Sequence, residues 1–128
     1  MMIDQIRIGR ISTINPQKGT ASVVYKDRDD SVTDELPLLA TEYMMPKIDD
    51  LVLVLHLRST QTGVIVGPIY NDKNRPVHSG KDVFYKDLGG DAYMLQEGGT
   101  LTIDASKIVF KCSSGSISLA SIISHIGG

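Results

Sequence analysis

Few side chains in this sequence are of the kinds that perform chemistry or hold a metal. A carboxylate cluster at Asp27, Asp29 and Asp30 could bind a cation, but the rest of a calcium-loop pattern is missing, so we interpret it as a solvated loop. His56 lies inside an apolar stretch with no second histidine nearby. This setting favours a hydrogen-bonded core or interface histidine over a metal ligand or a catalytic base.

The motifs that mark common active sites are missing from the sequence. No glycine-rich phosphate loop opens a helix, no histidine pair has metal-ligand spacing, and no Ser, His and acid form a recognisable nucleophile motif. Cys112 shares a predicted strand face with Ile108 and Phe110, which predicts a buried, unreactive thiol. We therefore expect a protein that is not an enzyme.

The composition is typical of a small protein with an aliphatic core. Of 128 residues, 41% are hydrophobic but only 5% are aromatic, and the net charge is −2. Nucleic-acid-binding proteins usually carry a basic face, so this charge argues against DNA or RNA as a partner. The N-terminus lacks a signal-peptide pattern and no apolar run is long enough to span a bilayer, which predicts a chain made as a soluble protein.

The elements that would position any site are centred on residues 36–70. Two apolar runs, 51–57 and 64–70, flank a polar turn, which predicts a β-hairpin. Because residues 51–57 are apolar at successive positions, we expect both strand faces to be buried. One face would fill a small barrel, and another copy of the protein would cover the other. The residues assigned to the barrel and the subunit contact are Leu51, Val52, Leu53, Val54, Leu55 and Leu57.

Further strands are expected before this hairpin, and a boundary after it. Strands are predicted over residues 6–11 (with a bend at Gly9), 20–25 and 32–36, and a short helical turn over 41–45. Five short strands with one helical turn are typical of the five-stranded barrel called the OB-fold. Residues 71–76 are polar and end in proline, so we place the boundary there, between domains of residues 1–76 and 77–128.

The C-terminal domain consists of short strand-like pieces separated by glycine-rich turns. These pieces lie at residues 83–85, 92–95, 100–103, 108–110 and 116–119. Their apolar faces are too thin to offset the entropy of ordering the segment alone. Several copies wound around one axis would share a continuous core, which predicts an intertwined β-helix. Its axis would be lined by Leu101, Ile103, Ile108, Phe110, Ile117 and Leu119. Residues 118–126 fit either a short terminal helix or a further strand.

Several short motifs follow one another along the first three fifths of the chain. They are Ile8-Gly9-Arg10-Ile11, Leu36-Pro37, Met45-Pro46, Asp49-Asp50 leading into Leu51-Val52-Leu53-Val54, residues 63–71, and Asn74-Arg75-Pro76. Their order and spacing resemble those of the baseplate assembly protein V family, the central spikes of contractile phage tails and related injection machines. The resemblance implies an all-β protein with an N-terminal OB-fold that docks on a hub beneath the tail tube. A C-terminal trimeric β-helix would then pierce the target cell envelope when the sheath contracts.

The resemblance also implies partners, a location and a possible metal. The partners would be two further copies, a separate hub protein, the target cell envelope and a separate spike-tip protein. The chain would be made in the bacterial cytoplasm and assembled into the baseplate of a virion or a bacteriocin particle. Some spikes end in a His-X-His motif that binds iron on the threefold axis. Here only His125 is comparable, so three copies could offer three ligands for iron or another transition metal.

A different class of function is also compatible with a small barrel. Many OB-folds bind oligonucleotides or other ligands, and single-strand binding uses a basic groove with stacking aromatic side chains. The tyrosines here are scattered along the chain and the net charge is slightly negative. We therefore rank a binding module second to the spike.

Overall fold

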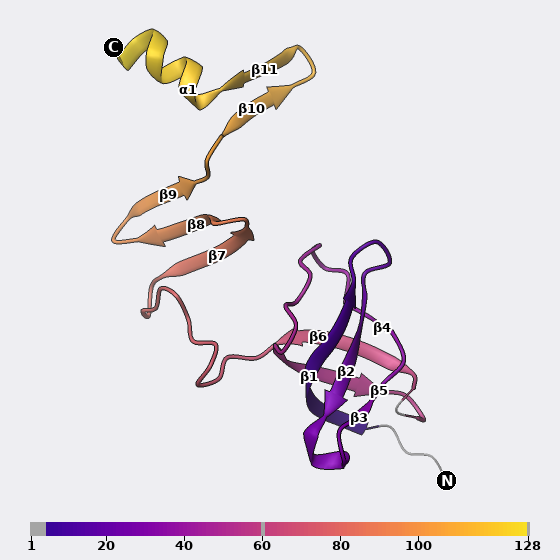
Figure 1. Ribbon diagram of the computed structural model, residues 1–128. Helices are drawn as coiled ribbons and strands as arrows, with labels where there is room; N and C mark the ends of the chain where they lie inside the picture. The colour runs from indigo at the N-terminus through magenta and orange to yellow at the C-terminus, as the bar shows by residue number, and fades with distance from the viewer. Residues whose placement is uncertain (1–4, 60, 128) are drawn as a thin grey trace. The chain divides into compact units, whose positions relative to one another are not determined.

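The computed structural model in Figure 1 describes residues 5–59 and 61–127 of the chain. Its secondary structure is mostly β-strand, as the sequence predicts. The chain divides between Pro76 and Val77 into two compact units, which are described separately below. Within the described residues, no helix is both long enough and apolar enough to cross a membrane.

The first unit is one antiparallel sheet that curls into a small barrel. Its strands are β1 (Gln5–Asn15), β2 (Thr20–Tyr25), β3 (Ser31–Val32), β4 (Leu36–Pro37), β5 (Leu51–His56) and β6 (Gly63–Pro68). β1 lies between β2 and β5, β6 continues beyond β5, and both β3 and β4 pair with β2. A parallel bridge between Leu38 and Ile65 joins the chain after β4 to β6, so the sheet closes on itself.

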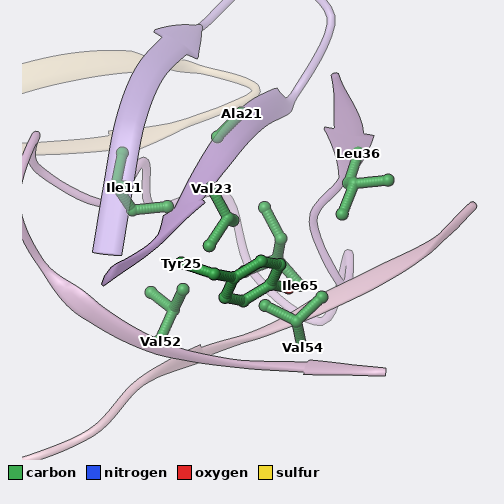
Figure 2. Packing of buried hydrophobic residues seen from close by; sticks show 8 residues of the cluster. All are labelled: Ile11, Ala21, Val23, Tyr25, Leu36, Val52, Val54 and Ile65. Carbon is green, nitrogen blue, oxygen red and sulfur yellow. The ribbon is translucent and has the colours of Figure 1, made fainter. Parts of the chain in front are cut away.

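The barrel interior is filled by aliphatic side chains and one tyrosine. The buried cluster, drawn in Figure 2, consists of Ile11, Ala21, Val23, Tyr25, Leu36, Val52, Val54 and Ile65. Strand alternation explains the pattern on β5, where Val52, Val54 and His56 point inward. The opposite face of β5 is only partly covered, and Leu55 is 39% exposed. One face of β5 thus fills the barrel as expected, and cover of the other face by a second copy of the protein stays a prediction.

Two other local predictions in this unit are wrong. The strand expected over residues 32–36 is interrupted after Val32, because the Thr33 hydroxyl accepts a hydrogen bond from the Val23 amide and displaces the ladder. Residues 41–45 do not form a helical turn; the chain turns at Ala40–Thr41, bends at Glu42 and has no regular secondary structure from Tyr43 to Pro46. Proline disfavours helical backbone at the residue before it, which accounts for the absence of a helical turn here.

The second unit contains three small pieces joined by turns. They are the meander β7 (Phe84–Gly89), β8 (Ala92–Glu97) and β9 (Thr100–Asp104), the hairpin β10 (Val109–Cys112) and β11 (Gly115–Ser118), and the helix α1 (Leu119–Ile122) with its π-helical continuation Ile123–Gly127. Of the two readings left open for residues 118–126, the structure has the helix. The Ser118 hydroxyl caps it by accepting a hydrogen bond from the Ser121 amide.

This unit has no interior of its own. Among residues 77–127, all of which the structure describes, none is buried. The buried core cluster of the chain lies wholly in the first unit. The short strands of the second unit therefore carry large apolar side chains that a single chain leaves in contact with water.

Candidate subunit-contact surfaces

The meander β7–β8–β9 has one face rich in exposed apolar side chains. Register pairs Met94 with Ile103, and Gln96 with both Phe84 and Leu101, so these residues lie on the same face. Leu101 is 60% exposed and Ile103 is 49% exposed. The axis residues Leu101 and Ile103 thus share a face with Phe84 and Met94, which sequence reasoning missed. Phe84 and Met94 could be assigned to this face only from the register between strands, which the sequence of a single strand does not reveal.

The opposite face of the meander is partly covered by the chain itself. The His78 ring lies against the rings of Tyr85 and Tyr93, with centroid separations of 5.1 and 6.2 Å. The two tyrosine rings lie 5.8 Å apart. One face of this sheet therefore has an intramolecular covering, whereas the face with Leu101 and Ile103 has none within the described residues.

The hairpin β10–β11 repeats this arrangement. Phe110 pairs directly with Ile117, and the carbonyl of Ile108 accepts a hydrogen bond from the Leu119 amide, which continues the same register. Phe110 is 56% exposed. Cys112 lies on this face but is exposed, so the prediction of a buried thiol is wrong for the single chain, because a two-stranded hairpin has no second layer to cover it.

All six predicted axis residues therefore lie on these two faces or at the start of α1. Their packing around an axis would involve further copies of the chain, and it stays a prediction. His125 lies exposed in the π-helical segment near the end of the chain. No group of three His, Cys, Asp or Glu side chains that could hold a metal occurs in the part of the chain that the structure describes. A metal shared by three copies of His125 also stays a prediction.

The outer face of the barrel is a second apolar surface. Ile6 pairs with Leu55 and Ile8 pairs with Leu53, which places these four side chains on the side of the sheet opposite the core. Ile6 is 73% exposed. Leu53 and Leu55 were predicted as subunit contacts, whereas Ile6 and Ile8 were predicted only as strand residues. The alternation of Ile6 and Ile8 with Arg7 and Gly9 could have predicted that the two isoleucines share one face of the strand.

A network of polar side chains lies on the inner side of β1, opposite the outer face with Ile6 and Ile8. The Arg7 guanidinium carbon lies 3.8 Å from the centroid of the Tyr25 ring, and Arg7 also contacts Asp27 at 3.3 Å. The Tyr25 hydroxyl is hydrogen-bonded to His56 Nε2, and His56 Nδ1 lies 3.1 Å from the Thr62 carbonyl oxygen. Since a carbonyl can only accept, Nδ1–H donates to Thr62 and Nε2 accepts from Tyr25.

These contacts confirm the interpretation of His56 as a hydrogen-bonded core histidine. Tyr25 and His56 are each 1% exposed, so the pair is sealed from solvent. Burial raises the pKa of Tyr25 to about 12; the nearby Arg7 cation partly offsets this rise and Asp27 adds to it. The arrangement stabilises the barrel and keeps the tyrosine protonated.

Barrel stability should decline at alkaline pH because of Tyr25. An unfolded tyrosine titrates near its ordinary value of 10.0, whereas folded Tyr25 keeps its proton up to about 12. The stabilisation is therefore complete below pH 10 and is lost as the pH rises toward 12. The full difference corresponds to about 3 kcal/mol in the free energy of unfolding. Urea unfolding of residues 1–76 between pH 8 and about pH 12 measures it.

Tyr25→Phe is the matched control for this titration. It lacks the hydroxyl, so its free energy of unfolding should not show the fall between pH 10 and about pH 12 that is assigned to Tyr25. At neutral pH it should be less stable than the parent by about 1–3 kcal/mol, because His56 Nε2 would be left buried without a donor. Identical pH profiles for the two proteins would contradict the assignment to Tyr25.

No protein-family model matches this chain, and no curated protein matches it either.

Proposed function

We propose that this chain is the subunit of a homotrimeric spike at the centre of a contractile-tail baseplate. The observation that carries the proposal is a C-terminal unit without a single buried residue whose strands nevertheless gather apolar side chains on one face. Monomeric proteins rarely leave such faces open. The motif order that resembles the baseplate assembly protein V family adds the specific setting.

Physical bookkeeping supports a C-terminal unit that becomes stable only on assembly. Ordering the backbone costs about 1–2 kcal/mol per residue, which must be offset mainly by burial of apolar surface. Fully burying a Leu, Ile or Phe side chain contributes about 1.5–3 kcal/mol. In the single chain Leu101, Phe110 and Ile117 make little of this contribution, since each is about half exposed or more. Two further copies would supply the missing cover and build a common axis.

The first unit would be the part that attaches to the baseplate. We infer that its closed sheet is an OB-fold. Two observations support this: five strands are hydrogen-bonded in the order β3-β2-β1-β5-β6, and the parallel bridge between Leu38 and Ile65 closes the sheet. Its aliphatic outer face around Ile8 and Leu55 would dock on neighbouring subunits or on a hub protein. Among residues 5–59 and 61–76, the side chains that register places on this face are aliphatic rather than the stacking aromatics of a single-strand-binding groove, so the spike is a better fit than an oligonucleotide-binding module.

The function would be mechanical. Sheath contraction would drive the tube forward, and a stiff, narrow trimer would concentrate the force on a small area of the target cell envelope. Stiffness would come from interchain β-pairing along the open edges of β7, β9, β10 and β11 and from an aliphatic axis.

Light scattering on two lengths of the chain tests this proposal. The full chain should have three times the subunit mass of 13.9 kDa. Residues 1–76 hold the complete buried core, so they should still fold but should associate far more weakly. Circular dichroism of the short form is the control for folding. A monomeric mass for the full chain would contradict the spike proposal.

A further inference from the structure

One edge of β1 is left uncovered by its neighbour. β5 pairs with β1 from Gln5 to Arg10, whereas β2 pairs with β1 only from Arg10 to Asn15. After Tyr25 the chain leaves the sheet through the 3₁₀ turn Lys26–Arg28. Within residues 5–59 and 61–127, no strand pairs with β1 along the other edge of residues 5–9.

The backbone groups of Ile6 and Ile8 point toward this open edge. In an antiparallel ladder, successive residues direct their N–H and C=O groups to alternate sides of the strand. The Ile11 amide donates to the Asp50 carbonyl and the Ile11 carbonyl accepts from the Asp49 amide, so Ile11 faces the β5 side. Counting back in steps of two, the odd-numbered residues of β1 also face β5. Ile6 and Ile8 therefore present donors and acceptors on the side that β2 leaves free.

A groove runs beside this edge. It has a volume of about 500 Å³ and is lined by Gln5, Ile6, Arg7, Ile8, Asp27 and Arg28. The strand edge forms one wall and the 3₁₀ turn contributes the other. Exposed strand edges of this kind are templates for a further strand, and peptide-binding domains use them for that purpose.

We propose that an extended segment of another protein adds to β1 here as an extra strand. Alternate side chains of that segment would extend the apolar face of Ile6 and Ile8. The side chains between them would lie beside Arg7, Asp27 and Arg28, a lining with two cations and one carboxylate. Arg7 pairs with Asp27 at 3.3 Å, so the charge of Arg28 is left over for a partner. The fitting partner is therefore a strand in which aliphatic residues alternate with acidic ones. This inference is independent of trimer formation by the C-terminal unit.

Amide hydrogen exchange followed by NMR tests the edge directly on the full chain. In the free protein, the Ile6 and Ile8 amides should exchange much faster than those of Arg7 and Gly9, which face β5. The probe is a peptide, Val-Glu-Val-Glu-Val-Glu, blocked at both ends. At saturation it should slow exchange at Ile6 and Ile8 by about tenfold or more, as expected when a free donor joins a ladder.

Two variants and one control peptide separate the parts of the proposal. Ile8→Pro removes an edge N–H that takes no part in the β5 ladder, so folding should persist while affinity for the peptide falls by about tenfold. Arg28→Glu should weaken binding by about fivefold through charge alone. The control peptide is Val-Lys-Val-Lys-Val-Lys. It should bind the parent protein more weakly than the acidic peptide does. On Arg28→Glu it should bind at least as tightly as the acidic peptide.

Three results would overturn the proposal. Slow exchange at Ile6 and Ile8 in the free protein at every concentration would mean that the chain fills its own edge. Slow exchange that appears as the protein concentration rises would assign the edge to a second copy of this chain. Equal binding of the acidic peptide to the parent and to Ile8→Pro would mean that the peptide does not bind as a strand.

Discussion

Replacing Phe110 by aspartate is expected to leave the full chain monomeric. Phe110 pairs with Ile117 on the apolar face of β10–β11 and is 56% exposed in the single chain. A charge there should cost a monomer little, because the site is open to water. In a trimer, three carboxylates would meet in an apolar interface, where uncompensated buried charges cost about 3–5 kcal/mol each. Sedimentation or light scattering over a range of concentrations measures the loss.

Val109→Asp is the matched control. Val109 lies next to Phe110 on the same strand but on the opposite face, pairs with Ser118, and is 48% exposed. It should keep the trimer, since its side chain points away from the apolar face. If both variants remained trimeric, the axis would have to lie elsewhere. If both became monomeric, the hairpin would be required as a whole and no single face of it could be assigned.

Replacing Gly9 by alanine should destabilise the barrel strongly. A Cβ atom at this position would lie 2.5 Å from Val23 Cγ1 and 2.6 Å from Tyr25 Cε1, well inside van der Waals contact. Both neighbours are buried, so neither can move away freely. The free energy of unfolding of residues 1–76 should fall by about 1–3 kcal/mol or more, as measured by urea unfolding.

Gly127→Ala, compared with Gly9→Ala in the full chain, is a control for the substitution itself. A Cβ atom there would lie 3.6 Å from the nearest side-chain atom, an ordinary contact, and should leave thermal unfolding unchanged. Gly9→Ala with parental stability would mean that Tyr25 does not lie over β1 as described. The sequence suggested a bend at Gly9, but β1 runs through this residue without a break. Close approach of the Tyr25 ring is what requires glycine.

Several strands were predictable because their signals are local. The alternation in residues 20–25 and the turn before residue 63 depend on neighbours in sequence, and β2 and the start of β6 lie at these positions. The same holds for the glycine-rich turns that separate β7, β8 and β9. Glycine supplies the left-handed backbone that such turns need, as at Gly98 and Gly99. The mostly-β class follows from these patterns alone.

The features missed from the sequence depend on distant residues. The split between β3 and β4 arises because the Thr33 hydroxyl bonds to a strand ten residues earlier. The requirement for Gly9 comes from a tyrosine on the next strand. Neither pattern has a periodic signal, because the cause is one contact rather than a repeat.

Local patterns in the sequence predicted most of the strands and the apolar faces of those strands. The sequence could not determine which faces meet, because register and strand order are set by packing between segments far apart in the chain. Packing between distant strands brings Arg7, Tyr25 and His56 into one network of side-chain contacts. Packing likewise sets Ile6 beside Leu55 on the exposed outer face. Likewise, only the pairing of β1 with two neighbours of different extent revealed the free edge at Ile6 and Ile8.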